Sequence, residues 1–274
     1  MFKHIQDINT LAAVARRIRR HIITMTGAAG SGHPGGSLSA VEILVTLFFS
    51  VLRHAPERPD WPDRDRFILS KGHAAPVLYA VMAECGYVPV EQLTTLRKLG
   101  SPFQGHPDRR FLPALEASTG SLGQGLSLAL GMGAAARLEG AAWRTYVVLG
   151  DGECQEGQIW EAAMFGAFQK IDNVCAIVDY NKIQLDGFVK DVMELEPFAA
   201  KWSGFGWHVI ELDGHDIAAL SKAFAEAAAV KGRPTVIIAH TVKGKGVSFM
   251  ENNPKYHGVA PTPAEVELAL KELS

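Results

Sequence analysis

Two short apolar runs, each followed at once by polar residues, restrict the possible folds of this chain more than any other feature. Thr145–Leu149 is followed by Gly-Asp-Gly, and Val174–Val178 is followed by Asp-Tyr-Asn. Runs as apolar as these are typical of parallel strands that are buried on both faces. Asp151 and Asn181 lie 30 residues apart, the length of one strand–helix–strand unit. We therefore expect both side chains at the carboxyl ends of neighbouring strands, at one edge of a sheet.

Helical segments alternate with short β-rich runs along the chain, which predicts a mainly parallel sheet with helices on both faces. This is the doubly wound α/β class. The other expected strands are residues 66–69, 207–211 and 235–240. The expected helices are residues 8–25, 39–51, 75–85, 121–138, 155–169, 216–229 and 263–273. No repeat or long linker interrupts the sequence, so we expect a single domain over residues 1–274.

Composition argues against several classes of protein. The chain has 27 Lys and Arg residues against 29 Asp and Glu residues, and this balance does not favour a protein built mainly to bind nucleic acid. The longest apolar stretch, residues 40–52, is interrupted by Glu42 and is shorter than the roughly 20 residues that cross a membrane. The three cysteines form no C-x-x-C motif, which favours a reducing, cytoplasmic setting.

The Gly-Asp-Gly turn and Asn181 have the chemistry of a magnesium site. Gly150 and Gly152 allow the backbone to turn sharply beside a ligand, and the following helix could direct its first amides at anionic oxygens. The Asp151 carboxylate, the Asn181 amide oxygen, a nearby carbonyl and diphosphate oxygens would complete an octahedral shell for Mg²⁺. The alternative is that Gly-Asp-Gly is only a turn and that Asn181 caps a strand.

Three of the ten histidines stand apart from the others. His33, His73 and His106 occur in Gly- and Pro-rich loops, which can bring imidazoles to a polar cleft where they transfer protons or bind hydroxyl groups. We expect structural roles for the histidines on helices, on strands or in other loops, which are His4, His21, His54, His208, His215 and His240.

A glycine-rich segment and two basic segments each allow a structural and a functional interpretation. The five glycines between Ser118 and Leu138 weaken a helix, so we expect either close helix packing or close approach to a ligand. The Lys243-Gly-Lys-Gly segment is either a solvated loop or a mobile cover that contacts phosphate or cofactor through Lys243. The expected first helix presents a solvated basic face, or one that binds phosphate or a partner, through Arg16, Arg17, Arg19 and Arg20.

Taken together, these segments resemble the transketolase family. Gly-Asp-Gly followed by Asn181 is similar to the thiamine diphosphate signature. Four further segments are similar to transketolase motifs and occur in the same order: residues 31–36, 69–74, 105–107 and 118–125. The resemblance runs from about residue 10 to residue 260 and implies a thiamine diphosphate-binding fold.

The resemblance implies a role for each matched residue. Mg²⁺, or Ca²⁺ or Mn²⁺ in its place, would be held by Asp151, Asn181 and the Ile183 carbonyl. The cofactor would contact His73, Gly120, Leu122, Gly150, Gly152, Asn181 and Lys243. The substrate channel would be lined by His33, His106 and His257, with His106 bonded to the transferred two-carbon fragment.

Glu156 follows Asp151 in the same motif. On the pattern alone it compensates a helix dipole at the surface. The resemblance instead places it with the cofactor-binding residues, in a carboxylate network that links paired active sites.

In transketolases, the glutamate that protonates the aminopyrimidine belongs to a second, pyrimidine-binding domain, which we expect on a partner chain. The resemblance therefore implies the N-terminal subunit of a split transketolase, in an α2β2 assembly with a C-terminal subunit. The pair would transfer a two-carbon ketol unit from a ketose phosphate to an aldose phosphate, in the pentose phosphate pathway or in a specialised sugar catabolic route.

Three alternatives stay open. The chain could be an α-type subunit of a 2-oxoacid dehydrogenase, although the motifs of residues 31–36 and 69–74 are unlike that family. It could resemble a deoxyxylulose-phosphate synthase, which normally carries both domains in one chain. It could also be a non-catalytic regulatory subunit.

Overall fold

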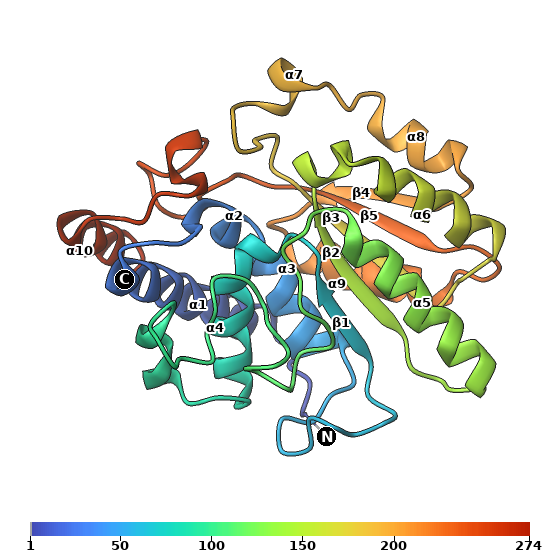
Figure 1. Ribbon diagram of the computed structural model, residues 1–274, viewed down its shortest axis with the longest axis horizontal. Coiled ribbons are helices and arrows are strands. Elements are labelled where there is room, and N and C mark those ends of the chain that lie inside the picture. The colour runs from blue at the N-terminus through green and yellow to red at the C-terminus, as the bar shows by residue number, and fades with distance from the viewer. Residues whose placement is uncertain (1) are drawn as a thin grey trace.

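A five-stranded, wholly parallel sheet forms the centre of the computed structural model, which describes residues 2–274 (Figure 1). The strands occur in the order β1-β2-β3-β5-β4, and every neighbouring pair is parallel. Their bounds are β1 (Arg66–Leu69), β2 (Thr145–Gly150), β3 (Val174–Tyr180), β4 (His208–Asp213) and β5 (Thr235–His240). All five predicted strands are confirmed, and β4 begins one residue later than expected.

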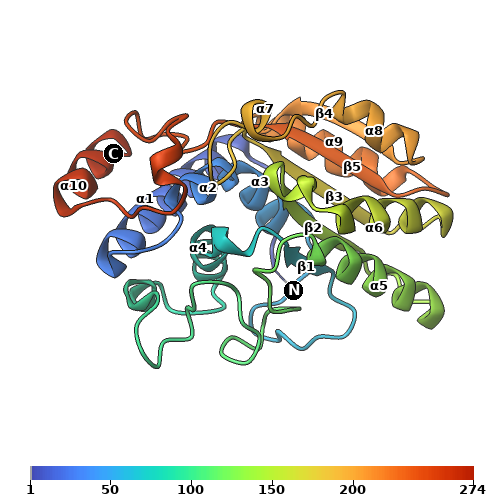
Figure 2. The ribbon, with the colours of Figure 1, turned by 45° about the horizontal axis from the view of Figure 1, so that its top comes forward.

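Helices cover both faces of the sheet because successive strand residues point to opposite sides. Val148 and Ile177 contribute to one core, with α1 (Ile8–Ala29), α3 (Val41–Thr46), α4 (Ala75–Cys85) and α9 (Ile217–Ala229). Val147 and Ala176 contribute to the other core, with α5 (Gln124–Glu139), α6 (Gly157–Phe168) and α8 (Phe198–Gly204). Figure 2 shows α5 and α6 side by side. The predicted doubly wound α/β class is therefore confirmed.

The remaining elements are short or lie at the margins. They are α2 (Pro34–Ser39), α7 (Val189–Val192), α10 (Pro263–Glu272), a π-helical turn at Leu47–Val51, and 3-10 turns at Gly72–Ala74, Val90–Thr95, Gly152–Gln155 and Pro254–His257. The last helix, α10, packs against α1 (Figure 1). No helix within residues 2–274 has the length and apolar character needed to span a membrane. That residues 1–274 form a single domain stays a prediction, and Met1 lies outside the described residues.

Several predicted helix boundaries are wrong for local backbone reasons. The expected helix 39–51 is divided, because Ala40 (φ −89°, ψ 5°) separates α2 from α3. The expected helix 121–138 begins only at Gln124, because Gly123 takes the left-handed region with φ 83°. Helix α1 runs beyond residue 25 to Ala29, where Gly30 ends it with φ 61°. The short helices α7 and α8 were not predicted.

The glycines of α5 divide into packed and open positions. A Cβ atom on Gly125 would lie 2.9 Å from Cα of Ser70, and one on Gly133 would lie 2.8 Å from a methyl carbon of Ile171. A Cβ on Gly131 would meet nothing within 4 Å. Close packing therefore explains Gly125 and Gly133, and only Gly131 retains the ordinary cost of a helical glycine.

Replacement by alanine should therefore change the free energy of unfolding in opposite directions at Gly125 and at Gly131. Gly125→Ala should lower the free energy of unfolding by about 1–3 kcal/mol, because the new methyl group overpacks the contact with Ser70. Gly131→Ala should raise it by about 0.5–1 kcal/mol, because alanine favours a helix. Urea unfolding followed by circular dichroism measures both, and equal effects of the two substitutions would contradict the packing described here.

Candidate functional site

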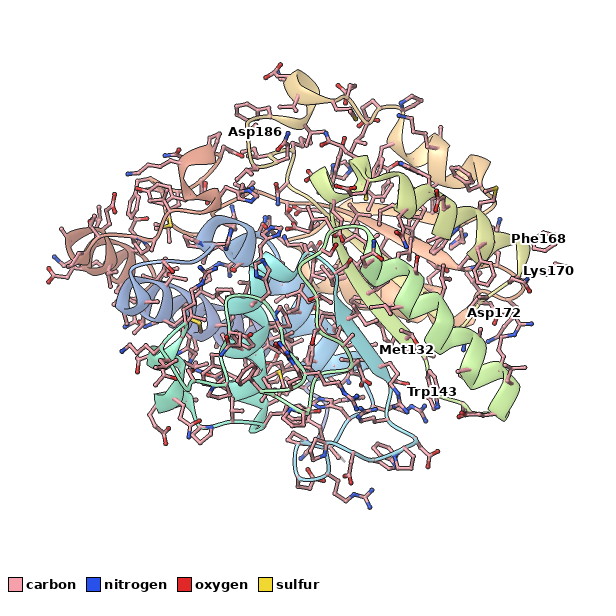
Figure 3. All side chains as sticks on the ribbon, in the orientation of Figure 1. Met132, Trp143, Phe168, Lys170, Asp172 and Asp186 are labelled. Atoms are coloured by element: carbon pink, nitrogen blue, oxygen red, sulfur yellow. The ribbon has the colours of Figure 1, made fainter. Side chains whose placement is uncertain are left out.

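A pocket of about 340 Å³ opens at the carboxyl ends of β2 and β3. One of its walls is the loop that contains Asp186, and Figure 3 shows this residue far from Lys170 and Asp172, which precede β3. The pocket is lined by all but one of the residues that the sequence analysis selected: His33, His73, Gly120, Leu122, Gly150, Asp151, Gly152, Glu156, Asn181, Ile183, Lys243 and His257. The exception, His106, is exposed and lies beside this lining, with its ring centroid 6.2 Å from that of His33.

Four imidazoles gather at the mouth of the pocket. The His73 ring centroid lies 5.3 Å from that of His33 and 5.0 Å from that of His257. Burial, with neighbouring positive charge as a second cause, lowers the pKa of His33 to about 4 and that of His257 to about 3. Burial also lowers the pKa of His73 and of His106. The cluster is therefore uncharged at neutral pH, and it can donate and accept hydrogen bonds without contributing positive charge.

The Asp151 carboxylate is buried at the end of β2 and lacks a cationic partner. It accepts hydrogen bonds from the backbone amides of Gly152 and Lys182. Within residues 2–274, no Lys, Arg or His nitrogen forms an ion pair with it. Burial, aided by the charge of Asp179, raises its pKa to about 6. A carboxylate in this state favours a cation bound beside it.

Asn181, after β3, is held in one orientation. Its amide nitrogen donates to an Asp179 carboxylate oxygen at 3.1 Å and to the Ser39 hydroxyl at 3.3 Å. Its amide oxygen accepts from the Ile183 backbone amide at 3.1 Å. Because the nitrogen is engaged in the protein interior, the oxygen is the atom that Asn181 can offer to a cation in the pocket.

Lys243 supplies a buried positive charge to the same pocket, beside the Ile183 carbonyl. Its side chain is 1% exposed, and its ammonium group donates to the Ile183 carbonyl at 2.8 Å and to Nδ1 of His257 at 2.7 Å. Among the described residues, no carboxylate forms an ion pair with it. Burial, followed by repulsion from Lys71, lowers its pKa to about 8. The interpretation of this segment as a solvated loop is wrong for Lys243.

The sequence analysis missed three buried residues that organise the site. Lys71 lies in one of the quoted motifs, yet only the structure shows that its ammonium pairs with Asp179 and also donates to the Gly36 carbonyl at 2.9 Å. Glu153 accepts from the backbone amides of Gly123 and Gly150, each at 3.0 Å, and from the Ser70 hydroxyl. Two of the three could have been noticed in the sequence. Asp179 is the acid of Asp-Tyr-Asn, and Glu153 is the next acid after Asp151.

Glu156 lies on the exposed rim of the same pocket. Glu153, rather than Glu156, provides the buried carboxylate that fixes the turn after β2. Whether Glu156 joins a network between paired sites stays a prediction.

The donor atoms in the pocket fit a divalent cation bound together with a diphosphate. No group of three or more His, Cys, Asp or Glu side chains among residues 2–274 is arranged to hold a metal ion, so a metal here needs amide, carbonyl and ligand oxygens. Asp151, Asn181 and the Ile183 carbonyl provide such oxygens, the type that Mg²⁺ prefers. The Asp151 carboxylate suits the cation and the Lys243 ammonium suits the diphosphate, since neither forms an ion pair among residues 2–274.

Comparisons with known proteins identify the family of the chain. The family model described as transketolase, thiamine diphosphate binding domain, matches residues 10–274. The 6-deoxy-6-sulfo-D-fructose transketolase subunit of Clostridium sp. (strain MSTE9) is 43% identical, over 94% of each chain. An apulose-4-phosphate transketolase subunit of Phocaeicola vulgatus is 39% identical, over 98% of this chain and 95% of the relative.

Longer transketolases match the same region. A transketolase structure from Pichia stipitis superposes with a TM-score of 0.92 at 31% identity, over 96% of this chain. The chain spans only 40% of that protein's length. The motifs, the fold and these matches together show that the chain belongs to the transketolase family and corresponds to its thiamine diphosphate-binding domain.

Proposed function

We propose that the chain is the N-terminal subunit of a split transketolase that depends on thiamine diphosphate and Mg²⁺. The observation that carries this proposal is the pair of buried, opposite charges on Asp151 and Lys243, which line one pocket and form no ion pair among residues 2–274. A metal ion and a diphosphate would compensate both charges at once. The match to transketolase subunits over 94–95% of their length supports the split form.

We assign the metal to Asp151, Asn181 and the Ile183 carbonyl, with Ca²⁺ or Mn²⁺ as possible substitutes for Mg²⁺. Lys243 and His73 would face the diphosphate, and the glycines of the pocket would let the backbone approach it closely. The cradle formed by these glycines comprises Gly120, Gly150 and Gly152, with Leu122 beside it. When bound, the cofactor would supply an acidic carbon that attacks a carbonyl and then stores electrons after carbon–carbon cleavage.

We assign the substrate channel to the uncharged imidazoles. His33, His106 and His257 would donate to and accept from sugar hydroxyls, and neutral rings can move a proton in either direction. By its match to the transketolase motif, His106 would bond the transferred two-carbon fragment, and its ring lies next to that of His33. Among the described residues that line the pocket, Lys71 and Lys243 carry positive charge, and Lys71 is paired with Asp179. Lys243 would therefore serve cofactor binding, and the imidazoles would serve proton transfer.

A separate C-terminal subunit would complete the site by binding and protonating the aminopyrimidine, in an α2β2 assembly. The relatives are named for a sugar phosphate and for a sulfonated sugar. We therefore propose an anionic ketose as donor and an aldose phosphate as acceptor, without committing to the pentose phosphate pathway or to another route. We place the complex in the cytoplasm.

The low pKa of His33 predicts a pH effect on the free chain. The unfolded chain takes up a proton at this imidazole below about pH 6.5, whereas the folded chain does so only near pH 4. The free energy of unfolding should therefore fall on acidification between these values. His33→Gln should remove about 1 kcal/mol of the loss between pH 7.5 and pH 5, a figure discounted for partial exposure. Urea unfolding at both pH values measures this, with His208→Gln as the control. An identical loss in wild type and His33→Gln would contradict the prediction.

Removing the Asp151 carboxylate tests the metal assignment. Asp151→Ala should weaken Mg²⁺-dependent binding of thiamine diphosphate by at least about tenfold, because the cation loses its charged ligand. Asp186→Ala is the matched control, since Asp186 lines the same pocket but has no assigned role. Isothermal titration with and without Mg²⁺ provides the measurement. Equal affinity in the two variants would contradict the assignment.

The requirement for a partner predicts that the chain alone is inactive. With thiamine diphosphate, Mg²⁺ and ketose and aldose phosphates, it should show no ketol transfer. Adding the C-terminal subunit should raise both turnover and cofactor affinity, because the cofactor spans the interface between them. A coupled assay of glyceraldehyde-phosphate formation measures turnover. Substantial turnover by the lone chain would overturn the split architecture, and cofactor binding without turnover in the complex would favour a regulatory subunit.

A further inference from the structure

A second buried ionic cluster lies outside the pocket and joins three distant segments. Glu42 on α3 accepts from Arg19 on α1 at 2.6 and 2.7 Å, and His215, two residues before α9, approaches the same carboxylate through Nδ1 at 2.9 Å. Arg19 and Glu42 are each 7% exposed. Burial opposes ionisation of Glu42, but the hydrogen bond from His215 and the charge of Arg19 lower its pKa to about 2. The expectation that Arg19 belongs to a solvated basic face is therefore wrong, because its side chain is buried.

Both basic members of the cluster also bind the backbone that follows β5. The amide of Val242 donates to Nε2 of His215 at 2.9 Å, and Nε of Arg19 donates to the Lys245 carbonyl at 2.9 Å. Since Nε2 accepts this bond, the proton of the neutral His215 ring lies on Nδ1 and is donated to Glu42. The cluster therefore fixes the chain at two points, Val242 and Lys245.

Lys243 lies between these two fixed points, and its side chain enters the pocket. It reaches the Ile183 carbonyl there. The turn around it has Gly244 at φ 81° and Gly246 at φ 91°, and the Gly244 amide donates to the Gly35 carbonyl at 3.0 Å. Glycine-rich backbone loses much conformational entropy when it is ordered, so external contacts are needed to hold this turn in one arrangement.

We propose that Arg19, Glu42 and His215 are positioning residues that hold residues 242–245 so that the Lys243 ammonium is preorganised for an anionic ligand. None of the three lines the pocket, so they act through Lys243. A preorganised cation binds its ligand without the cost of ordering the loop first. The proposal rests on the proposed function only for the identity of the ligand, a diphosphate bound with Mg²⁺.

The chain contains a matched control cluster with the same three residue types. Glu84 on α4 accepts from Arg17 at 2.9 Å and bonds Nε2 of His21 at 2.8 Å, both on α1. The hydrogen bonds of this cluster within residues 2–274 join α1 to α4 and do not reach residues 242–245. Its loss removes an ion pair of the same residue types, with Arg17 more exposed than Arg19, without releasing the Lys243 turn.

Hydrogen–deuterium exchange of the full chain tests the positioning directly. His215→Leu should speed amide exchange in residues 242–246 by at least about tenfold, whereas His21→Leu should leave this segment unchanged. His215→Gln, which keeps one donor and one acceptor, should restore slow exchange. If His215→Leu does not fold, Arg19→Lys serves as the test variant. Lysine can pair with Glu42 but lacks the second donor group through which Arg19 reaches the Lys245 carbonyl. Unchanged exchange in a folded variant of either kind overturns the proposal.

A double-mutant cycle then tests whether the cluster acts through Lys243. His215→Leu should weaken binding of thiamine diphosphate with Mg²⁺ by about tenfold, and His21→Leu should not. In a Lys243→Ala background, His215→Leu should cause no further loss, because the residue it positions is absent. A tenfold loss in both backgrounds overturns the proposal. Failure of the wild-type chain and its complex to bind the cofactor would contradict the proposed function, while the exchange comparison still decides the positioning claim.

Discussion

The parallel pairing of β2 with β3 places Gly150 opposite Asp179, and the geometry of the site depends on this register. Asp151 and Asn181 follow directly and come to lie on the same edge of the sheet. Asp179 is fully buried and accepts from Ser39, Lys71, Asn181 and Thr241. One carboxylate thus joins α2, the turn after β1, and the segments after β3 and β5. Removing one partner of such a buried pair costs about 3–5 kcal/mol.

The charges in the pocket are arranged for a ligand that carries both signs. Lys71 is neutralised within the protein by Asp179. Asp151 and Lys243 attract each other but form no ion pair among residues 2–274, and burial moves their pKa values to about 6 and about 8. Buried charges of this kind destabilise the free protein, and a cation–diphosphate complex offers each of them a partner. The buried charges that lower the stability of the free chain would therefore favour the cofactor-bound form.

The sheet and the meeting of Asp151 with Asn181 at one sheet edge were predictable from sequence because their signals are local. Buried parallel strands appear as apolar runs, and the bounds of β1 and β5 agree with the prediction at both ends. The spacing of Asp151 and Asn181 follows from one strand–helix–strand unit. The break at Ala40 was not predictable in this way, because apolar residues continue on both sides of it. The sequence pattern therefore does not indicate the change in backbone angles that ends α2 and begins α3.

The ionic contacts were not predictable because they join residues far apart in sequence. Lys71 meets Asp179 and Arg19 meets Lys245 only after the strands have taken their order in the sheet. No pattern within either segment identifies its partner. The resemblance to transketolases selected the pocket residues, but the same residues did not reveal which charges lack a partner inside the chain.

The central claim is that Asp151, Asn181 and the Ile183 carbonyl hold a metal ion beside a diphosphate. Crystals grown with thiamine diphosphate and Mn²⁺, studied by anomalous scattering at the manganese edge, test this most directly. We expect one anomalous peak within about 2.5 Å of all three oxygens, since hard cations bind oxygen at such distances. A peak among the four imidazoles, or cofactor bound in the pocket without a metal at these oxygens, would contradict it.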